Sequence, residues 1–403
     1  MLNRALILVI IGISLLQLAC SSKDNSEPPA PLTKIEQPIP LYMQWKVETG
    51  AGIDTASYNM RPLLIQDTVY SIDTEGMVSS INAENGNLNW ISFTRLASIT
   101  GLSGTEGMVI ASSKNGDLNA YDIEDKNLKL KWSIRLNGEV RAVPVISDQQ
   151  VFVRTVDGKL SALSLLDGSV QWTVSRRVPA LSLTGNSQPL IQDNLVIAGF
   201  DDGKISAFDR DTGQTVWQTT VSNPSGRTEI ERLVDLDGQF ILRDGIIYIS
   251  SYQGRLAAIQ AIDGNVLWSR EFSSYQSIDA DDEALYLSSD DSHIWSIDRR
   301  TGSAFWKQEV LHARKITAPR IIGNKLVVAD FEGYLHMFDK SEGSLLGRVR
   351  PTQNRHIAKP LIWQDSVIIL DSNGVLAGVR IDDRKFKVYP GGSQVIDDDI
   401  SRK

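Results

Sequence analysis

Residues 203–217 read Gly-Lys-Ile-Ser-Ala-Phe-Asp-Arg-Asp-Thr-Gly-Gln-Thr-Val-Trp. A glycine opens an alternation of small and apolar residues, a polar turn ends at a second glycine, and a tryptophan follows. Alternation of this kind predicts a β-strand, and turn residues between two such runs separate neighbouring strands. The stretch therefore predicts two short strands joined by a turn.

The same pattern recurs along most of the chain. Its copies start at Gly76, Gly116, Gly158, Gly203, Gly254, Ser292 and Gly333. An eighth start at Gly374 has no tryptophan after it, Trp45 precedes the first copy, and Gly347 replaces the tryptophan of the seventh. The tryptophan positions lie about 43 residues apart on average, a period typical of propellers and related repeat proteins.

Each unit contains two further apolar runs, which gives four short strands per unit. The chain opens on an unpaired tryptophan strand and closes on an unpaired glycine strand, and a linear array would leave both edges bare. The sequence therefore predicts an all-β fold, an eight-bladed β-propeller of four-stranded blades over residues 42–381, closed by its N-terminal strand. We expect the tryptophans to pack between neighbouring blades. Turn acids should bond their own backbone, as at Asp122, Asp209, Asp298 and Asp339.

The N-terminus explains the single cysteine. Residues 1–19 carry Arg4 and then an apolar run too short to span a bilayer, the layout of a secretory signal peptide. Cys20 follows directly, as in a bacterial lipobox, although Gln17 stands where a leucine is usual. Residues 20–41 form a Pro-rich tether that would reach about 60 Å if it were extended as polyproline. Residues 382–403 form a charged tail, which we expect to be flexible.

Composition excludes several classes of function. The chain carries 41 Lys and Arg against 49 Asp and Glu, a net charge of −8, and lacks the basic clusters that nucleic acids require. One cysteine excludes a disulfide framework, and the four histidines show no familiar ligand spacing. We therefore expect neither a metal nor a cofactor. The acidic run at residues 279–283 resembles a solvated turn.

The glycine and tryptophan repeat also resembles that of the pyrroloquinoline quinone dehydrogenases, which form eight-bladed propellers. That resemblance would imply a quinone and a Ca²⁺ in the central funnel and, in many members, a disulfide between adjacent cysteines. The chain has no cysteine pair and lacks the long insertions that build those active sites. We therefore expect no enzymatic activity and keep a quinone-dependent dehydrogenase as the alternative.

Two longer insertions follow the tryptophan strands of consecutive units. Residues 174–188 offer Leu181 and Leu183, and residues 219–238 offer Glu229, Arg232, Asp235 and Asp237. Equivalent positions in consecutive blades should place both insertions side by side on one face. Apolar anchors beside an acidic cluster suit a protein-docking surface, although the leucines could instead fill the top of the propeller.

The lipobox, the tether, the eight repeats and these insertions resemble the BamB family, lipoprotein subunits of the outer-membrane β-barrel assembly machinery. The most specific stretches are Leu181-Ser182-Leu183-Thr184-Gly185, residues 226–233 with Asp235 and Asp237, and Leu311-His312. The resemblance implies that Leu181, Leu183, Asp235 and Asp237 bind the periplasmic POTRA domains of the barrel-forming subunit. Thr184 stands where the family commonly has arginine.

These observations predict a non-catalytic lipoprotein on the periplasmic face of the outer membrane, anchored through Cys20. It would bind the barrel-forming subunit and assist the folding and insertion of outer-membrane β-barrel proteins, with nascent substrates as a further partner. A propeller scaffold serving another envelope complex remains an alternative.

Overall fold

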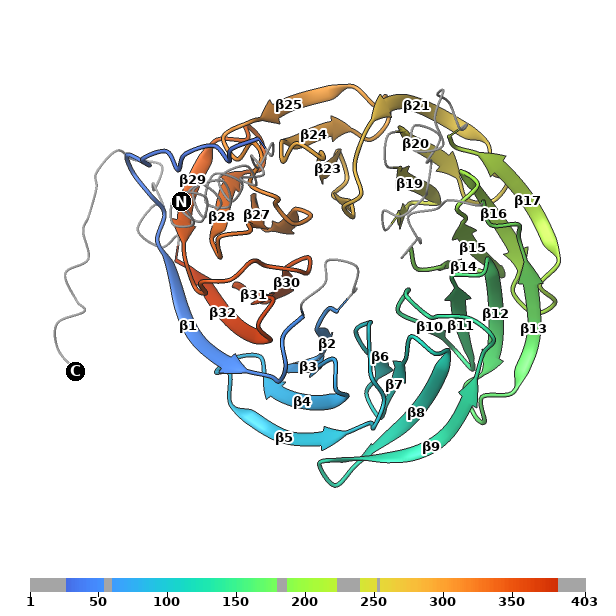
Figure 1. The fold of residues 1–403 in the computed structure, drawn as a ribbon. Coiled ribbons are helices and arrows are strands. Elements are labelled where there is room, and N and C mark those ends of the chain that lie inside the picture. The colour runs from blue at the N-terminus through green and yellow to red at the C-terminus, as the bar shows by residue number, and fades with distance from the viewer. Residues whose placement is uncertain (1–26, 54–59, 180–186, 223–239, 252–253, 383–403) are drawn as a thin grey trace, which may run out of the picture.

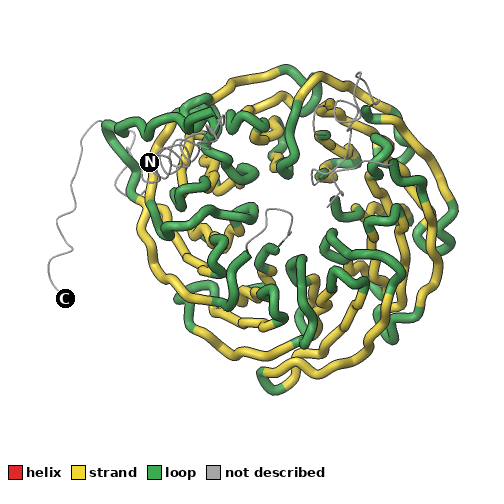
Figure 2. The backbone as a smooth tube through the Cα atoms, in the orientation of Figure 1, coloured by secondary structure: helices red, strands yellow, loops and turns green. Residues whose placement is uncertain are grey.

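The computed structural model describes residues 27–53, 60–179, 187–222, 240–251 and 254–382. Over these ranges the chain forms eight four-stranded antiparallel sheets, arranged around a central axis as the blades of a ring (Figures 1 and 2). These ranges contain no helix, and so none long and apolar enough to cross a membrane. The predicted all-β, eight-bladed propeller is confirmed.

The blades follow one another along the chain, and each runs from an innermost to an outermost strand. Blade 1 comprises β2 (Leu63–Ile65), β3 (Thr68–Ile72), β4 (Met77–Asn82) and β5 (Leu88–Phe93). Blade 2 comprises β6 (Ser103–Thr105), β7 (Met108–Ser112), β8 (Asp117–Glu124) and β9 (Asn127–Arg135). Blade 3 comprises β10 (Val145–Ser147), β11 (Gln150–Thr155), β12 (Lys159–Ser164) and β13 (Val170–Ser175). Blade 4 comprises β14 (Leu190–Gln192), β15 (Leu195–Gly199), β16 (Lys204–Asp209) and β17 (Thr215–Thr220).

The second half of the ring repeats the arrangement. Blade 5 comprises β18 (Ile241–Arg243), β19 (Ile246–Ser250), β20 (Gly254–Gln260) and β21 (Val266–Phe272). Blade 6 comprises β22 (Asp279–Ala280), β23 (Ala284–Ser288), β24 (Ile294–Asp298) and β25 (Ala304–Gln308). Blade 7 comprises β26 (Arg320–Ile322), β27 (Lys325–Ala329), β28 (Leu335–Asp339) and β29 (Leu345–Val349). Blade 8 comprises β30 (Leu361–Trp363), β31 (Ser366–Leu370), β32 (Val375–Ile381) and β1 (Leu41–Glu48).

Blade 8 closes the ring with strands from both ends of the chain. Its order is β1-β32-β31-β30, and β1 pairs antiparallel with β32 from Leu41 opposite Ile381 to Glu48 opposite Val375. Figure 1 shows the two strands side by side, β1 in blue and β32 in red. The pairing removes the two bare edges that a linear array would leave, and it confirms closure by the N-terminal strand.

Six of the eight boundaries between neighbouring blades are joined by a repeat tryptophan. Each indole packs on the turn between the third and fourth strands of the following blade, where a Cβ on the turn glycine would lie only 2.5–2.8 Å from the ring. Each Nε1–H also donates to a backbone carbonyl of that turn at 2.8–3.1 Å. The pairs are Trp45 with Ala83, Trp132 with Leu165, Trp172 with Arg210, Trp217 with Ala261, Trp268 with Arg299, and Trp306 with Lys340. The predicted packing between blades is confirmed at these six positions.

The turn of blade 2 differs from the others. Its hairpin is extended, with Asp125 and Lys126 in the left-handed region at φ values of 48° and 61°. Trp90 therefore meets no glycine turn, and its ring packs 5.9 Å from that of Tyr70 in its own blade. The same extension changes the role of Asp122, which lies 3.5 Å from Lys131 Nζ.

The remaining turn acids behave as predicted. Asp209, Asp298 and Asp339 each accept hydrogen bonds through Oδ1 from backbone N–H groups two and three residues later. Each carboxylate fixes the turn on which a tryptophan of the preceding blade packs.

Candidate partner-binding face

One face of the ring carries every connection from an outermost strand to the next blade. The turns between second and third strands lie on the same face, because Thr94, Leu136, Arg176 and Val221, each just past an outermost strand, donate to the carbonyls of turn glycines at 2.8–2.9 Å. We call this the connection face. The turns between first and second strands and between third and fourth strands lie on the opposite face.

The predicted docking residues belong to two consecutive connections whose described ends lie on this face. Leu181, Leu183 and Thr184 lie between blades 3 and 4, and Glu229, Arg232, Asp235 and Asp237 lie between blades 4 and 5. All seven lie outside the described residues, as does Cys20. Of their described ends, residues 187 and 222 adjoin blade 4, whereas residue 179 follows blade 3 and residue 240 precedes blade 5.

A buried ion pair anchors the first connection, and sequence reasoning missed it. Arg154 of β11 donates to Asp201 Oδ1 at 2.5 Å, across the boundary between blades 3 and 4. A second guanidinium nitrogen donates to Ser187 Oγ at 2.8 Å, where the described chain resumes. The guanidinium also lies 5.4 Å from the ring of Phe200. The available signal was a charged residue at the end of the apolar run Val151–Arg154.

The second connection is also held at both ends. Val221 N and Ser222 N both donate to Gly203 O, at 2.9 and 3.2 Å. Phe240 is buried in the cluster between blades 4 and 5, together with Trp217 and Ile249. The segment that contains Asp235 and Asp237 therefore begins and ends on rigid blades.

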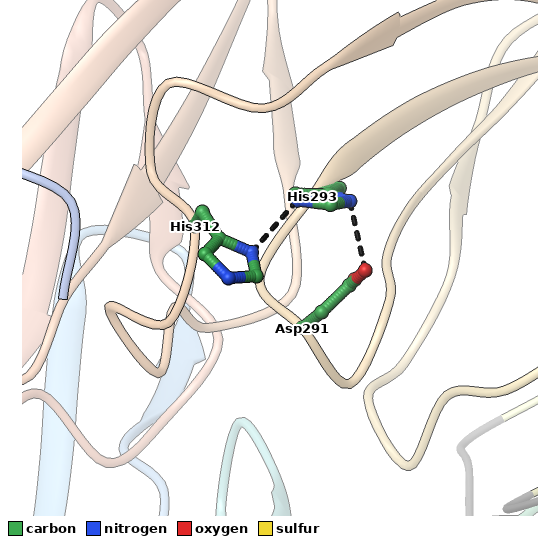
Figure 3. A group of neighbouring side chains, drawn as sticks. All are labelled: Asp291, His293 and His312. Atoms are coloured by element: carbon green, nitrogen blue, oxygen red, sulfur yellow. Dashed lines mark hydrogen bonds and ion pairs between the residues drawn. The ribbon is translucent and has the colours of Figure 1, made fainter. Parts of the chain in front are cut away.

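The connection face carries a second polar group at blades 6 and 7, formed by Asp291, His293 and His312 (Figure 3). His293 Nε2 and His312 Nδ1 share a hydrogen bond at 2.9 Å, and His293 Nδ1 lies 2.8 Å from Asp291 Oδ2. Beyond them, His312 Nε2 lies 2.9 Å from Glu27 Oε1. The bond to Glu27 raises the pKa of His312, whereas burial lowers the pKa of His293.

This trio is the group of described residues whose side chains could supply three ligands to a metal ion, with ligand atoms within 4.8 Å of one another. His293, however, turns different nitrogens toward its two partners, as Figure 3 shows. An ion bound by all three would need one of those nitrogens to face both partners. The side chains instead form a row of polar contacts that runs from Asp291 through the two histidines to Glu27.

Charged side chains also meet beside the innermost strands. Asp279 of β22 lies 3.3 Å from Arg320 Nη1 and 3.6 Å from Lys359 Nζ. Burial lowers the pKa of Lys359 to about 8. The interpretation of residues 279–283 as a solvated turn is therefore wrong at Asp279, which is a paired strand carboxylate, and at Asp281, which lies 2.6 Å from Lys340 Nζ.

Comparison with known proteins decides the family. Residues 78–308 match the family model described as outer membrane protein assembly factor BamB. The chain belongs to the BamB family. It is 30% identical to the BamB of Yersinia pestis over 93% of this chain and 98% of that protein. It is 31% identical to the BamB of Vibrio cholerae, again over 93% and 98%.

Solved structures agree with the family assignment. The crystal structure of BamB from Moraxella catarrhalis superposes with a TM-score of 0.75 at 25% identity, covering 85% of this chain and all of that one. The quinohemoprotein alcohol dehydrogenase of Comamonas testosteroni superposes with a TM-score of 0.69 at 12% identity, over 84% of this chain and 76% of that one. The second likeness shows a shared fold alone. The BamB structure and the dehydrogenase structure thus share the propeller fold with this chain.

Proposed function

We propose that this BamB-family protein is a non-catalytic lipoprotein of the outer-membrane β-barrel assembly machinery. It is anchored through lipid on Cys20 at the periplasmic face of the outer membrane. Its connection face binds the POTRA domains of the barrel-forming subunit and assists folding and insertion of outer-membrane β-barrel proteins. Family membership along nearly the whole chain carries the proposal, since the relatives it matches are named as assembly factors.

The arrangement of blade 4 supports the docking part of the proposal. Both candidate connections are attached to this blade, and their ends are fixed by buried contacts at Arg154, Ser187 and Phe240. A rigid base limits the conformational entropy that ordering a loop costs on binding. The apolar anchors in one connection would then supply affinity for the partner, and the carboxylates in the other would fix its orientation.

Charge reversal tests the docking face. We expect the double variant Asp235→Arg, Asp237→Arg to lose co-purification with the barrel-forming subunit. The matched control reverses two exposed acids in turns of the same two blades on the opposite face, Asp211→Arg and Asp263→Arg. Equal recovery of the partner by both double variants, with unchanged circular dichroism, would remove the connection face from the proposal.

A separate experiment tests the anchor. Cys20→Ala should abolish fatty-acid labelling and move the protein from the membrane to the soluble fraction, because no other cysteine is present to carry the lipid. Retention of label in the variant would exclude Cys20 as the lipidated residue. Recovery of a quinone-dependent dye-reducing activity, or of a different envelope complex, would favour the alternatives.

A further inference from the structure

The segment that precedes β1 is bound along the outside of blade 7. Ala30 N donates to His312 O at 2.9 Å, and Ile39 N donates to Leu346 O at 2.9 Å. Glu27 lies against His312 at 2.9 Å. Figure 1 shows the segment in blue beside β29. Residues 27–40 therefore form a docked strap, the name used below.

Two arginines, the buried Arg314 and the half-buried Arg348, hold carbonyls of the strap. Arg314 Nη1 donates to Ala30 O at 3.1 Å, and Arg348 Nη2 donates to Thr33 O at 2.9 Å. Hydrogen bonds to charged donors are stronger than neutral ones. The strap is thus fixed at two backbone positions whatever its side chains are.

A buried network connects these two arginines. Arg314 Nε donates to Asp330 Oδ2 at 2.8 Å, and His336 Nε2 lies 2.9 Å from the same oxygen. Arg348 Nε donates to His336 Nδ1 at 3.3 Å, so His336 must carry its proton on Nε2 and donate it to Asp330. Asp330 and His336 are fully buried. The two arginines that hold the strap are therefore braced by buried groups of blade 7.

The missing tryptophan of the seventh repeat marks the same site. A Cβ at Gly347 would lie 2.6 Å from Ile39 O, so no larger residue fits beneath the strap. A tryptophan here would also have no turn to pack on, because the two outer strands of blade 8, β32 and β1, come from opposite ends of the chain. Gly347 is thus the one departure from the repeat that makes room for the strap.

The strap runs from one face of the ring to the other. Ile39 lies at the start of β29, beside the turn between β28 and β29 on the face opposite the connection face. Glu27 lies at His312, in the connection between blades 6 and 7. The described chain therefore begins, at Glu27, on the connection face, where the described ends of the candidate docking connections also lie.

We propose that the strap holds the propeller with its connection face toward the lipid surface, blade 7 nearest to it. The inference rests on the proposed lipid anchor at Cys20. Six residues lie between Cys20 and Glu27, and the chain from one to the other spans at most about 25 Å, against roughly 60 Å for a tether free along its whole length. A partner bound to the connection face then occupies the space between the propeller and the bilayer.

The orientation is measured with two labels on blade 7 of the full-length lipidated protein. Gln353 is exposed on the connection face and Glu342 on the opposite face. Since Cys20 is the only cysteine and carries the lipid, Gln353→Cys or Glu342→Cys supplies the sole free thiol for a fluorophore.

The labelled protein is bound to vesicles of phosphatidylethanolamine and phosphatidylglycerol that contain a nitroxide-headgroup lipid as quencher. With the described start of the strap held within about 25 Å of the lipid, we expect stronger quenching at position 353 than at position 342. Equal quenching, or stronger quenching at position 342, overturns the orientation.

Variants that release the strap test whether the strap causes the orientation. Arg348→Ala and Gly347→Trp should make quenching equal at the two positions while vesicle binding persists. Arg350→Ala is the matched control, because this neighbouring arginine donates to Glu332 O and not to the strap. A difference that survives both releasing variants overturns the role of the strap. Failure of the unaltered protein to bind vesicles overturns the lipid anchor itself, and the orientation with it.

Discussion

Gly264→Ala tests the packing of tryptophans between blades. Gly264 has a φ of +76°, and an added Cβ would lie 2.5 Å from Cε3 of Trp217. An alanine in the left-handed region costs about 1–2 kcal/mol, and overpacking a well-filled contact adds about 1–3 kcal/mol. We therefore expect Gly264→Ala to lower the free energy of unfolding by about 2–5 kcal/mol, as the sum of these two costs.

The control lies in the same blade. Gly245 has a φ of +73° with no heavy atom within 4 Å of an added Cβ, so Gly245→Ala should cost only about 1–2 kcal/mol. Urea denaturation followed by far-UV circular dichroism measures both, independently of changes in tryptophan content. Trp217→Ala should also remove the extra cost of Gly264→Ala, a coupling of about 1–3 kcal/mol. Equal destabilisation by the two alanine variants would refute the steric argument.

Three further predictions concern individual buried side chains. Ser292 replaces the repeat glycine at a φ of 67°. Ser292→Gly should therefore raise the free energy of unfolding by about 0.5–1 kcal/mol, and a lower urea midpoint would contradict the assigned strain. Arg154→Ala leaves Asp201 buried without its cation and should cost about 3–5 kcal/mol in the same assay, whereas no loss would show the pair to be dispensable. Burial lowers the pKa of His336 and His356, so the unfolded chain binds more protons. Stability should be full above about pH 6.5 and fall as the pH drops below it. Urea midpoints that do not change between about pH 7.5 and 5.5 would contradict this.

The repeat predicted the architecture because it is a local pattern repeated many times. Alternation, turn residues and period each indicate short strands, and eight copies with mismatched ends leave a ring as the arrangement without bare edges. The tryptophans could be placed between blades since a large apolar residue at an equivalent position in every unit must meet an equivalent neighbour.

The candidate docking residues Leu181, Leu183, Asp235 and Asp237 were found from unit-specific insertions and from the family resemblance. Their positions lie outside the described residues, so their role stays a prediction. Arg154 and its partner Asp201 could not be paired from sequence, because they are 47 residues apart and lie in different blades. Side-chain contacts of this kind depend on how two blades are set against each other.

The sequence by itself determined the blade, the number of blades and the closure, because each follows from residue types at fixed local spacing. Only the tertiary structure decided where residues 27–40 lie and why position 347 is a glycine. That contact joins residues more than 300 positions apart, Thr33 to Arg348, and no periodicity encodes it. Its physical basis is a pair of arginines, linked through Asp330 and His336, that donate to the carbonyls of a crossing chain.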